Sequence, residues 1–464
     1  MDSVNDFLSD ASSFIWGPWL LIPLLLSTGL YLTILLRGLQ VRHFRLAFWL
    51  AFVRRSDSDA AEGDISHYQA LATALAATVG VGNIAGVATA IALGGPGAVF
   101  WMWVTGMVGM ATKYSEAFLG VRFRRSDAVG EQAGGPMHYL RNGIKGPVGL
   151  ILGGFFAVAG AIAAFGIGNG VQANTVAANV EEEWGLDPYI TGAIVTVFAG
   201  AVILGGIKNI GRVTSAFVPV MIILYVVGAA AVLAFNIEEV PGAFGVIFSD
   251  AFSGTSATGG FVGAGVAAAI RYGVARGIFS NESGLGTGGI AAAAAKTDHP
   301  VRQALVSMTQ TFIDTLVVVS FTALTIVVTG VWKDAGEDEA AQFTARAFDE
   351  GLPGDWASVI VTLSVIFFAF STILGWSYYG DRCVEFLFGR RAVLPYRLLF
   401  LVVVYVGSVT TLTTVWTFSD VMNGLMALPN LIGLLILSPL VYRETRDYFR
   451  QRPAEGEKAE TAAK

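Results

Sequence analysis

Long apolar runs dominate this 464-residue chain, and most are about twenty residues long, the length that a helix needs to cross a bilayer. Hydrophobic residues make up 54% of the chain and charged residues only 14%, which excludes an ordinary soluble domain of this size. We expect an all-α polytopic membrane protein with eleven transmembrane helices, at residues 16–36, 67–93, 98–121, 148–180, 189–207, 215–235, 256–296, 303–332, 356–379, 394–411 and 415–442.

The basic residues predict the orientation, because Lys and Arg gather in cytoplasmic loops. With the N-terminus outside, nearly all of them fall in inner loops, and the outer loops hold only Lys333 and Arg346. We therefore expect a multi-pass protein of the cell membrane with an extracellular N-terminus at 1–15, an extracellular connector at 236–255 and a cytoplasmic disordered tail at 443–464.

Two of the apolar spans carry more glycine than a plain crossing helix needs. Residues 73–90 read TALAATVGVGNIAGVATA, and residues 276–286 read RGIFSNESGLG. Glycine allows the backbone to leave helical dihedrals. The freed N–H and C=O groups must then be satisfied inside the membrane, and a bound ion or substrate can do that. For the first segment taken alone, close helix packing through small residues is an equal alternative.

The positions of these two spans predict the architecture. With the first span set aside, they are the first and the sixth of the remaining ten, so each opens a set of five. Because five is odd, the two sets enter the membrane from opposite sides, as in inverted repeats with discontinuous helices at the binding site. We expect one extra N-terminal helix at 16–36, a first five-helix repeat at 67–235 and a second at 256–442.

Oxygen atoms suited to a small cation gather in two of the spans. An unwound turn in the first broken span would expose carbonyls, to which Asn83 adds a side-chain oxygen, and the half-helix beyond it would offer N–H groups to a carboxylate. Ser371 and Thr372 are adjacent hydroxyls that either ligate sodium or bond to the preceding helical turn. Trp376 shares a helical face with Thr372 and is either a pocket wall or a packing aromatic.

A third polar group lies in the span at 148–180. Phe165, Asn169 and Gln172 follow the i, i+4, i+7 spacing of one helical face. Buried amides are costly in a membrane unless they bond to something. We favour this face toward the substrate, with helix–helix hydrogen bonding as the alternative.

Charged residues within the spans predict ion pairs. Glu282, in the second broken span, is expected to pair with Arg276 or Arg271, or else to sense the coupling ion. Lys113 and Glu116 are three residues apart and are expected to form a local pair.

One block of sequence resembles a known family. GGPGAVFWMWVTGMVG, at residues 94–109, is similar to the signature of the alanine or glycine:cation symporters, the sodium:alanine symporter family. TVGVGNIAGVATA, RGIFSNESGLG and TDHPVRQAL also resemble stretches of that family in the same order, so the resemblance covers essentially the whole chain. It implies a LeuT-like fold with one extra N-terminal span and sodium-coupled uptake of small neutral amino acids, chiefly alanine and glycine.

The segment TVGVGN also resembles AVGLGN in the unwound first core helix of the leucine-type sodium symporters. The resemblance implies two sodium sites, the first with ligands from Ala76, Val79, Ser371 and Thr372 and the second with Thr78 and Asn83. A tyrosine that contacts the substrate carboxylate in that wider family has no counterpart here, so Gln172 or Asn169 is expected to replace it. The expected substrate pocket comprises Thr78, Gly80, Gly82, Asn83, Phe165, Asn169, Gln172, Ile278, Asn281, Thr372 and Trp376.

We therefore expect a secondary active transporter, not an enzyme, that takes up alanine or glycine with Na+ as the coupling ion by alternating access. Proton-coupled symport is the alternative, because Asp314 and Glu282 are carboxylates within the membrane. A channel-like pore would need a continuous polar lining, whereas the polar groups cluster in four spans. The expected partners are a small neutral amino acid, sodium and the lipid bilayer, without nucleic acid, and the expected state is a monomer.

Overall fold

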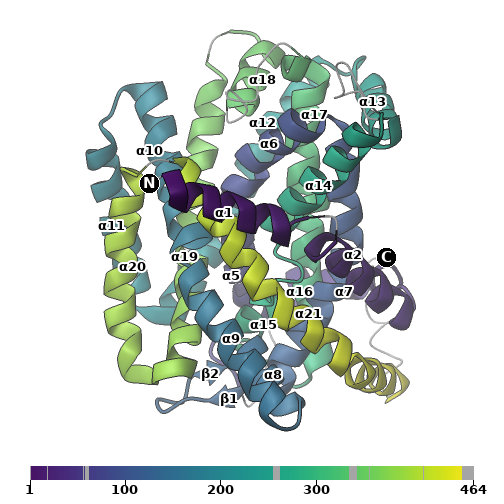
Figure 1. The fold of residues 1–464 in the computed structure, drawn as a ribbon, viewed down its shortest axis with the longest axis vertical. Coiled ribbons are helices and arrows are strands. Elements are labelled where there is room, and N and C mark those ends of the chain that lie inside the picture. The colour runs from purple at the N-terminus through teal and green to yellow at the C-terminus, as the bar shows by residue number, and fades with distance from the viewer. Residues whose placement is uncertain are drawn as a thin grey trace.

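The computed structural model of this chain describes residues 2–17, 19–55, 57, 62–253, 262–333, 342–354, 356–410 and 412–451. The described residues are almost entirely helical, with one two-stranded antiparallel sheet formed by β1 (Arg125–Ser126) and β2 (Gln132–Ala133). In Figure 1, α11 (Pro188–Ile203) and α20 (Val393–Ser408) stand upright along one edge, and α21 (Leu412–Gln451) crosses the front obliquely.

Several predicted spans are divided into shorter helices. Before the sheet lie α1 (Asp2–Ile15), α2 (Leu21–Leu35), α3 (Leu39–Arg42), α4 (Phe44–Phe48), the π-helix η1 (Trp49–Arg54), α5 (His67–Thr78), the 3-10 helix η2 (Val81–Asn83), α6 (Ala85–Gly94) and α7 (Gly97–Arg122). After the sheet come α8 (Pro136–Gly143), α9 (Pro147–Ala163), the π-helix η3 (Gly166–Gly170), α10 (Val171–Trp184), α11, α12 (Gly206–Phe235) and α13 (Val240–Ser253).

The second half of the chain begins with another divided span. Its helices are α14 (Val262–Asn281), α15 (Thr287–Ala293), α16 (Pro300–Thr311), the π-helix η4 (Phe312–Val319), α17 (Ser320–Thr329), the 3-10 helix η5 (Val331–Lys333), α18 (Phe343–Gly351), α19 (Ser358–Phe388), the 3-10 helix η7 (Arg390–Ala392), α20 and α21.

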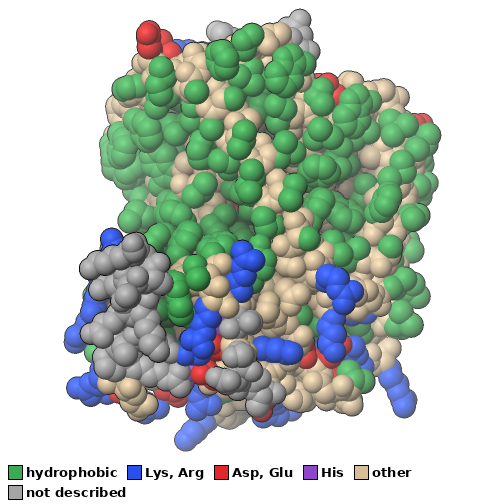
Figure 2. Space-filling model, turned by 180° about the vertical axis from the view of Figure 1, so that it is seen from behind, with side chains coloured by type: hydrophobic (Ala, Val, Ile, Leu, Met, Phe, Trp, Pro, Cys, Tyr) green, Lys and Arg blue, Asp and Glu red, His purple; other side chains and the backbone are tan. Residues whose placement is uncertain are grey.

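The surface of the molecule suits a membrane. Among the described residues, six helices are long and apolar enough to cross a bilayer by length and composition, and four shorter helices are also apolar. Large apolar side chains on the outer helices are exposed, such as Val197 and Phe198 on α11 and Ile223 on α12. Figure 2 shows this apolar surface above a lower end where Lys and Arg gather. The protein is a multi-pass membrane protein, and the count of eleven spans stays a prediction.

The two predicted terminal segments and the connector contain helices. Residues 2–15 form α1, and the connector contains α13. The predicted disordered tail is wrong at its start, because α21 continues to Gln451. Tertiary contacts hold this extension: Thr445 bonds to the hydroxyl of Tyr114 (2.8 Å), and Tyr448 is buried. Residues 452–464 lie outside the described residues.

Small residues allow the core helices to approach closely. A Cβ added at Gly375 of α19 would lie 2.7 Å from both the backbone N and the Cβ of Ala77 in α5. A Cβ at Gly277 of α14 would lie 2.5 Å from the hydroxyl of Thr105 in α7. Close approach through small residues is typical of membrane helices, and here it brings α19 against the first broken span.

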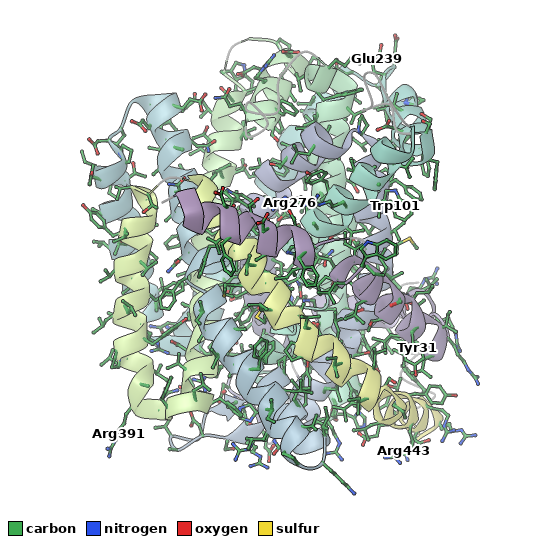
Figure 3. All side chains as sticks on the ribbon, viewed as in Figure 1. Tyr31, Trp101, Glu239, Arg276, Arg391 and Arg443 are labelled. Atoms are coloured by element: carbon green, nitrogen blue, oxygen red, sulfur yellow. The ribbon has the colours of Figure 1, made fainter. Side chains whose placement is uncertain are left out.

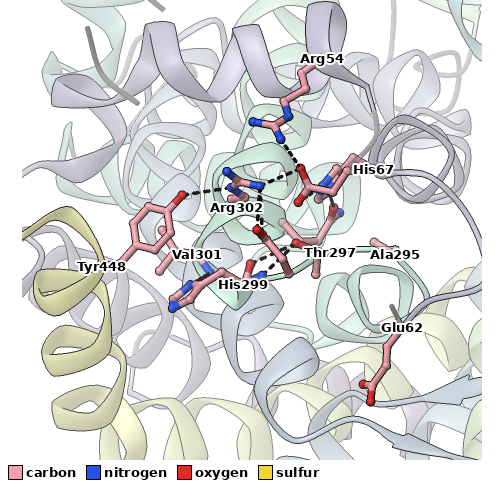
Figure 4. A network of polar contacts seen from close by, with 12 residues as sticks. Arg54, Glu62, His67, Ala295, Thr297, His299, Val301, Arg302 and Tyr448 are labelled. Carbon is pink, nitrogen blue, oxygen red and sulfur yellow. Dashed lines mark hydrogen bonds and ion pairs between the residues drawn. The ribbon is translucent and has the colours of Figure 1, made fainter. Parts of the chain in front are cut away.

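A buried ion-pair network ties the N-terminus of α5 to α16, and Figure 4 shows it at close range. Asp57 Oδ1 lies 2.8 Å from Arg302 NH1, and Asp57 Oδ2 lies 3.2 Å from His67 Nε2. Arg302 also lies 3.0 Å from Asp298, and its Nε donates to the hydroxyl of Tyr448 (3.2 Å). Burial by itself would raise the pKa of Asp57, but its contacts with His67 and Arg302 outweigh burial and hold that pKa below its ordinary value.

We expect Arg302→Gln to lower the thermal unfolding temperature of the purified protein. It removes one of the two guanidinium groups that contact Asp57 Oδ1, since Arg54 remains 3.1 Å from it. Loss of one partner of a buried pair costs up to about 3–5 kcal/mol, and the partly exposed Arg54 compensates only part of it. The exposed Arg45 offers a control, since Arg45→Gln should leave stability nearly unchanged. Adding Asp57→Asn should restore part of the loss, and an Arg302→Gln protein as stable as the wild type would contradict the prediction.

Candidate functional site

The first broken span is interrupted where its glycines are. Helix α5 ends at Thr78, Val79 and Gly80 leave helical geometry, and α6 begins at Ala85 after one 3-10 turn. Asn83 satisfies one freed donor, because its side-chain oxygen accepts from the N–H of Gly80 (2.9 Å). The Asn83 carbonyl accepts from the hydroxyl of Thr322 on α17 (2.8 Å). The expected interruption of this span is therefore present.

The second broken span unwinds between Asn281 and Thr287. Glu282, Gly284 and Gly286 have φ angles of +56°, +103° and +90°, which a continuing right-handed helix does not allow. The sequence did not indicate which side chain satisfies this turn. It is Glu116 of α7, whose Oε1 accepts from the N–H groups of Gly284 and Gly286, each at 2.9 Å.

A polar cluster surrounds Glu116. Its Oε2 lies 3.7 Å from the Lys113 ammonium, which confirms the expected local pair. Lys113 also donates to the carbonyl of Glu282 (3.0 Å), so the ammonium contacts the second break as well. Asn430 of α21 donates to Glu116 Oε1 (2.8 Å) and accepts a short hydrogen bond from the hydroxyl of Tyr139.

The two breaks lie against each other. A Cβ added at Gly82 would lie 3.0 Å from the ring of Phe279 and 3.4 Å from the Cα of Ser280. Asp314 bridges the two spans, because Asn83 Nδ2 donates to its Oδ1 (2.7 Å) and the Ser280 hydroxyl donates to its Oδ2 (2.9 Å). This carboxylate is fully buried. Sequence reasoning singled out Asp314 but did not predict its contact with Asn83, which lies 231 positions away.

Helix α19 places two hydroxyls over the first break. Ser371 Oγ lies 3.2 Å from the carbonyl oxygen of Ala76 and 3.4 Å from that of Val79, and Thr372 Oγ1 lies 3.1 Å from that of Ala76. Both hydroxyls also lie near the carbonyl of Phe368 in their own helix, at 2.8 and 3.1 Å. Ser371 thus has three carbonyl oxygens in reach but only one proton to donate, so this cluster of oxygens suits a small hard cation.

Gly80 is the point where three helices converge. A Cβ at this position would overlap the hydroxyl of Thr372 and lie 3.3 Å from the side-chain oxygen of Gln172. That same oxygen of Gln172 accepts from the N–H of Val81 (3.2 Å). Gln172 therefore reaches the first break from α10 and satisfies one of its freed N–H groups.

Phe165 and Asn169 lie against α20 and do not contact the first break. The Phe165 ring packs on Tyr396 and Phe400 of α20, and Asn169 donates to the carbonyl of Phe400 (3.1 Å). The intervening residues form the π-helix η3, whose wider turn shifts the facing of side chains, so the spacing i, i+4, i+7 does not keep Gln172 on the same side. The structure does not bring these two residues to the break, and their assignment to the substrate stays a prediction.

Trp376 is held by a carboxylate of the second break. Its indole N–H donates to Glu282 Oε1 (2.7 Å), and the Thr287 hydroxyl donates to Glu282 Oε2 (2.6 Å). The expected pair between Glu282 and an arginine is wrong, because Arg276 instead lies 3.3 Å from Asp420 on α21. The exposed fraction of Trp376 is zero, so the ring is enclosed by the helices around the two breaks.

The remaining predicted residues have their own contacts. Thr78 bonds to the carbonyls of Ala74 (3.0 Å) and Leu75 (3.4 Å) in its own helix. Ile278 is buried in α14. Asn281 donates to the Thr315 hydroxyl (3.0 Å), beside Asp314.

Comparison with known proteins identifies the family. The sequence pattern of the sodium:alanine symporter family matches residues 1–463. The chain belongs to the sodium:alanine symporter family. The "Sodium/alanine symporter AgcS" of Methanococcus maripaludis is 50% identical over 462 residues, covering 99% of this chain and 100% of the relative. The "Putative sodium/proton-dependent alanine carrier protein YrbD" of Bacillus subtilis is 36% identical, covering 96% of this chain and 93% of the relative.

A solved structure shares the fold. The substrate-bound, outward-open state of a Na+-coupled sialic acid symporter matches with a TM-score of 0.52 and 10% identity, covering 88% of this chain and 98% of that one. Membership of the sodium:alanine symporter family makes the chain a membrane transporter rather than an enzyme, and Na+ its coupling ion.

We expect Gly80→Ala to abolish the stabilisation of the purified protein by Na+. The added methyl would overlap the Thr372 hydroxyl and push α19 from the Ala76 and Val79 carbonyls. Gly86 is the matched control in the same broken span, because a Cβ there meets no atom within 4 Å. Gly86→Ala should keep the Na+-dependent rise in unfolding temperature, and an equal response from both variants would argue against a constraint at Gly80.

Proposed function

We propose that this protein takes up a small neutral amino acid, alanine or glycine, together with Na+ by alternating access. The observation that carries the proposal is the approach of the Ser371 and Thr372 hydroxyls to the carbonyls of Ala76 and Val79. These four oxygens come from two helices, so a cation bound among them joins α19 to the first break. Sodium binding would thereby favour one arrangement of the two helices over another.

The substrate site that we propose lies beside this cation. Unwound backbone at Gly80 and Val81 offers N–H groups, which Asn83 and Gln172 satisfy in this structure. A substrate carboxylate would take these donors in their place, in the manner of anions at the ends of half-helices. Trp376 would close the pocket, and its indole, held by Glu282, would limit the size of the side chain that enters.

The positive charge of Na+ adds an electrical driving force for uptake. Each charge moved inward across 100 mV contributes about 2.3 kcal/mol, which is roughly fortyfold accumulation per sodium. A zwitterionic substrate carries no net charge, so this electrical contribution comes from the cation alone.

A second cation site is proposed around Asp314. A carboxylate within the membrane requires compensation, and the hydrogen-bond donors to Asp314 are the neutral side chains of Asn83, Ser280 and Thr315. We assign this position to a second sodium. The alternative is a proton on Asp314, which would make the transport partly proton-dependent. The name of the Bacillus subtilis relative YrbD includes both ions.

Alanine uptake into liposomes tests the main proposal. An inward Na+ gradient should drive accumulation that an equal choline gradient at fixed pH does not. Ser371→Ala removes one oxygen from the proposed first sodium site and should raise the sodium concentration for half-maximal uptake by about ten- to a hundredfold. Ser364 of the same helix is the control, because its buried hydroxyl donates to the carbonyl of Ile360 in its own turn (2.7 Å), and Ser364→Ala should behave as wild type. Uptake that ignores sodium would refute the proposal.

The Asp314→Asn variant tests whether Asp314 holds a second sodium ion or a transported proton. If Asp314 holds a second sodium, the variant should show a less steep dependence of uptake on sodium concentration, and wild-type uptake at a fixed sodium gradient should ignore an imposed pH gradient. If Asp314 carries a transported proton, the wild type should follow the pH gradient and the variant should not. Binding of sodium measured calorimetrically provides a readout that does not depend on turnover.

A further inference from the structure

A basic cavity of about 230 Å³ lies between the N-terminal helices and the end of α21. Arg37 and Arg42 line it from the segment that follows α2, and Arg446 and Arg450 line it from α21. The other lining residues are Leu36, Leu39, His43, Tyr442, Thr445 and Phe449. Four guanidinium groups therefore surround one hollow, and none of its ten lining residues is acidic.

Three of the four arginines of this cavity have no carboxylate partner among the described residues. Among the described residues, Arg37, Arg42 and Arg450 form no ion pair, and Arg446 has only a pair with its exposed neighbour Asp447 (3.2 Å). Two other arginine-rich pockets contain their own acids, including Asp127 and Glu385 in one and Glu62 and Asp298 in the other. Four arginines against the single carboxylate of Asp447, which lies outside the lining, leave a net positive field that favours an anionic ligand.

Aromatic rings and an apolar helix face adjoin the charge. His43 stacks on Phe449 with ring centroids 3.9 Å apart and forms one wall. On α2, directly before the cavity, Leu30, Tyr31 and Ile34 are exposed by 52%, 42% and 68%. Figure 3 shows Tyr31 of α2 and Arg443 of α21 at the same corner of the molecule. A ligand in the cavity would therefore lie where an apolar, membrane-suited surface meets a basic end.

We propose that this cavity binds the phosphate head group of an anionic phospholipid, with an acyl chain along the exposed face of α2. Guanidinium groups pair with phosphate oxygens through two parallel hydrogen bonds, and basic pockets between membrane helices suit anionic head groups. The apolar face of α2 favours a lipid over a free phosphate, since a free ion has nothing to place there. The proposal concerns binding only and holds whether or not the transport mechanism proposed above is correct.

Native mass spectrometry of the full-length protein in detergent tests the proposal. Delipidated protein is titrated with phosphatidylglycerol or, as the neutral comparison, phosphatidylcholine. Wild-type protein should bind phosphatidylglycerol preferentially, and the Arg→Gln variant at all four cavity positions should lose about fivefold in affinity for each arginine removed. The matched control removes four exposed cations outside the cavity, at Lys145, Lys208, Arg212 and Arg391.

The control variant should bind phosphatidylglycerol as the wild type does, because its net charge matches that of the cavity variant. Equal loss in both variants, or no preference for phosphatidylglycerol in the wild type, would overturn the proposal. Displacement of the lipid by inorganic phosphate at equal concentration would also overturn it, since the site would then bind a free ion. Arg42→Gln and Arg450→Gln, each expected to weaken binding about fivefold, keep the test decisive if the fourfold variant does not fold.

Discussion

The need to satisfy backbone hydrogen bonds away from water governs this structure. A continuous helix satisfies its own N–H and C=O groups, but the two glycine-broken spans do not, and they lie side by side in the core. Each freed group therefore needs a partner outside the regular helical ladder, such as a nearby or distant side chain. Glu116 supplies two acceptor bonds to the second break, and Asn83 and Gln172 supply one each to the first.

Glu116 and Gln172 come from helices far in the sequence from the breaks that they satisfy, whereas Asn83 belongs to the first break itself. The packing of the bundle therefore stabilises the breaks, and the hydrogen bonds at the breaks join its helices. Close packing makes this possible. Gly375 lets α19 approach Ala77, and the adjacent turn of α19 then carries Ser371 and Thr372 to the carbonyls of the first break. Asp314 links the two breaks through hydrogen bonds from Asn83 and Ser280. Glu282 accepts a hydrogen bond from the indole of Trp376 and so fixes its position. In the proposed function, ions and substrate would thus compete for groups that the protein satisfies internally in this structure.

Periodicity failed as a guide where the helix itself was irregular. Phe165, Asn169 and Gln172 share a face only if the helix between them turns regularly, and the π-helix at Gly166–Gly170 ends that regularity. The end of α21 shows a related limit, because the charged composition beyond Arg443 predicts disorder whereas contacts of Thr445 and Tyr448 keep the helix intact. In both cases a prediction made from a short stretch of sequence differs from the structure, where contacts with residues distant in the sequence decide the outcome.

The sequence by itself determined the membrane class, the two breaks and the adjacent hydroxyls of α19, because apolar length, glycine content and unusual polar residues are local properties. It also carried the family signature. Only the tertiary structure decided which side chains satisfy the breaks, since the bonds of Glu116 to Gly284 and of Asn83 to Asp314 join residues 168 and 231 positions apart. Such pairings follow from how helices pack, and close packing is set by the shapes of all the neighbouring side chains together rather than by any one segment.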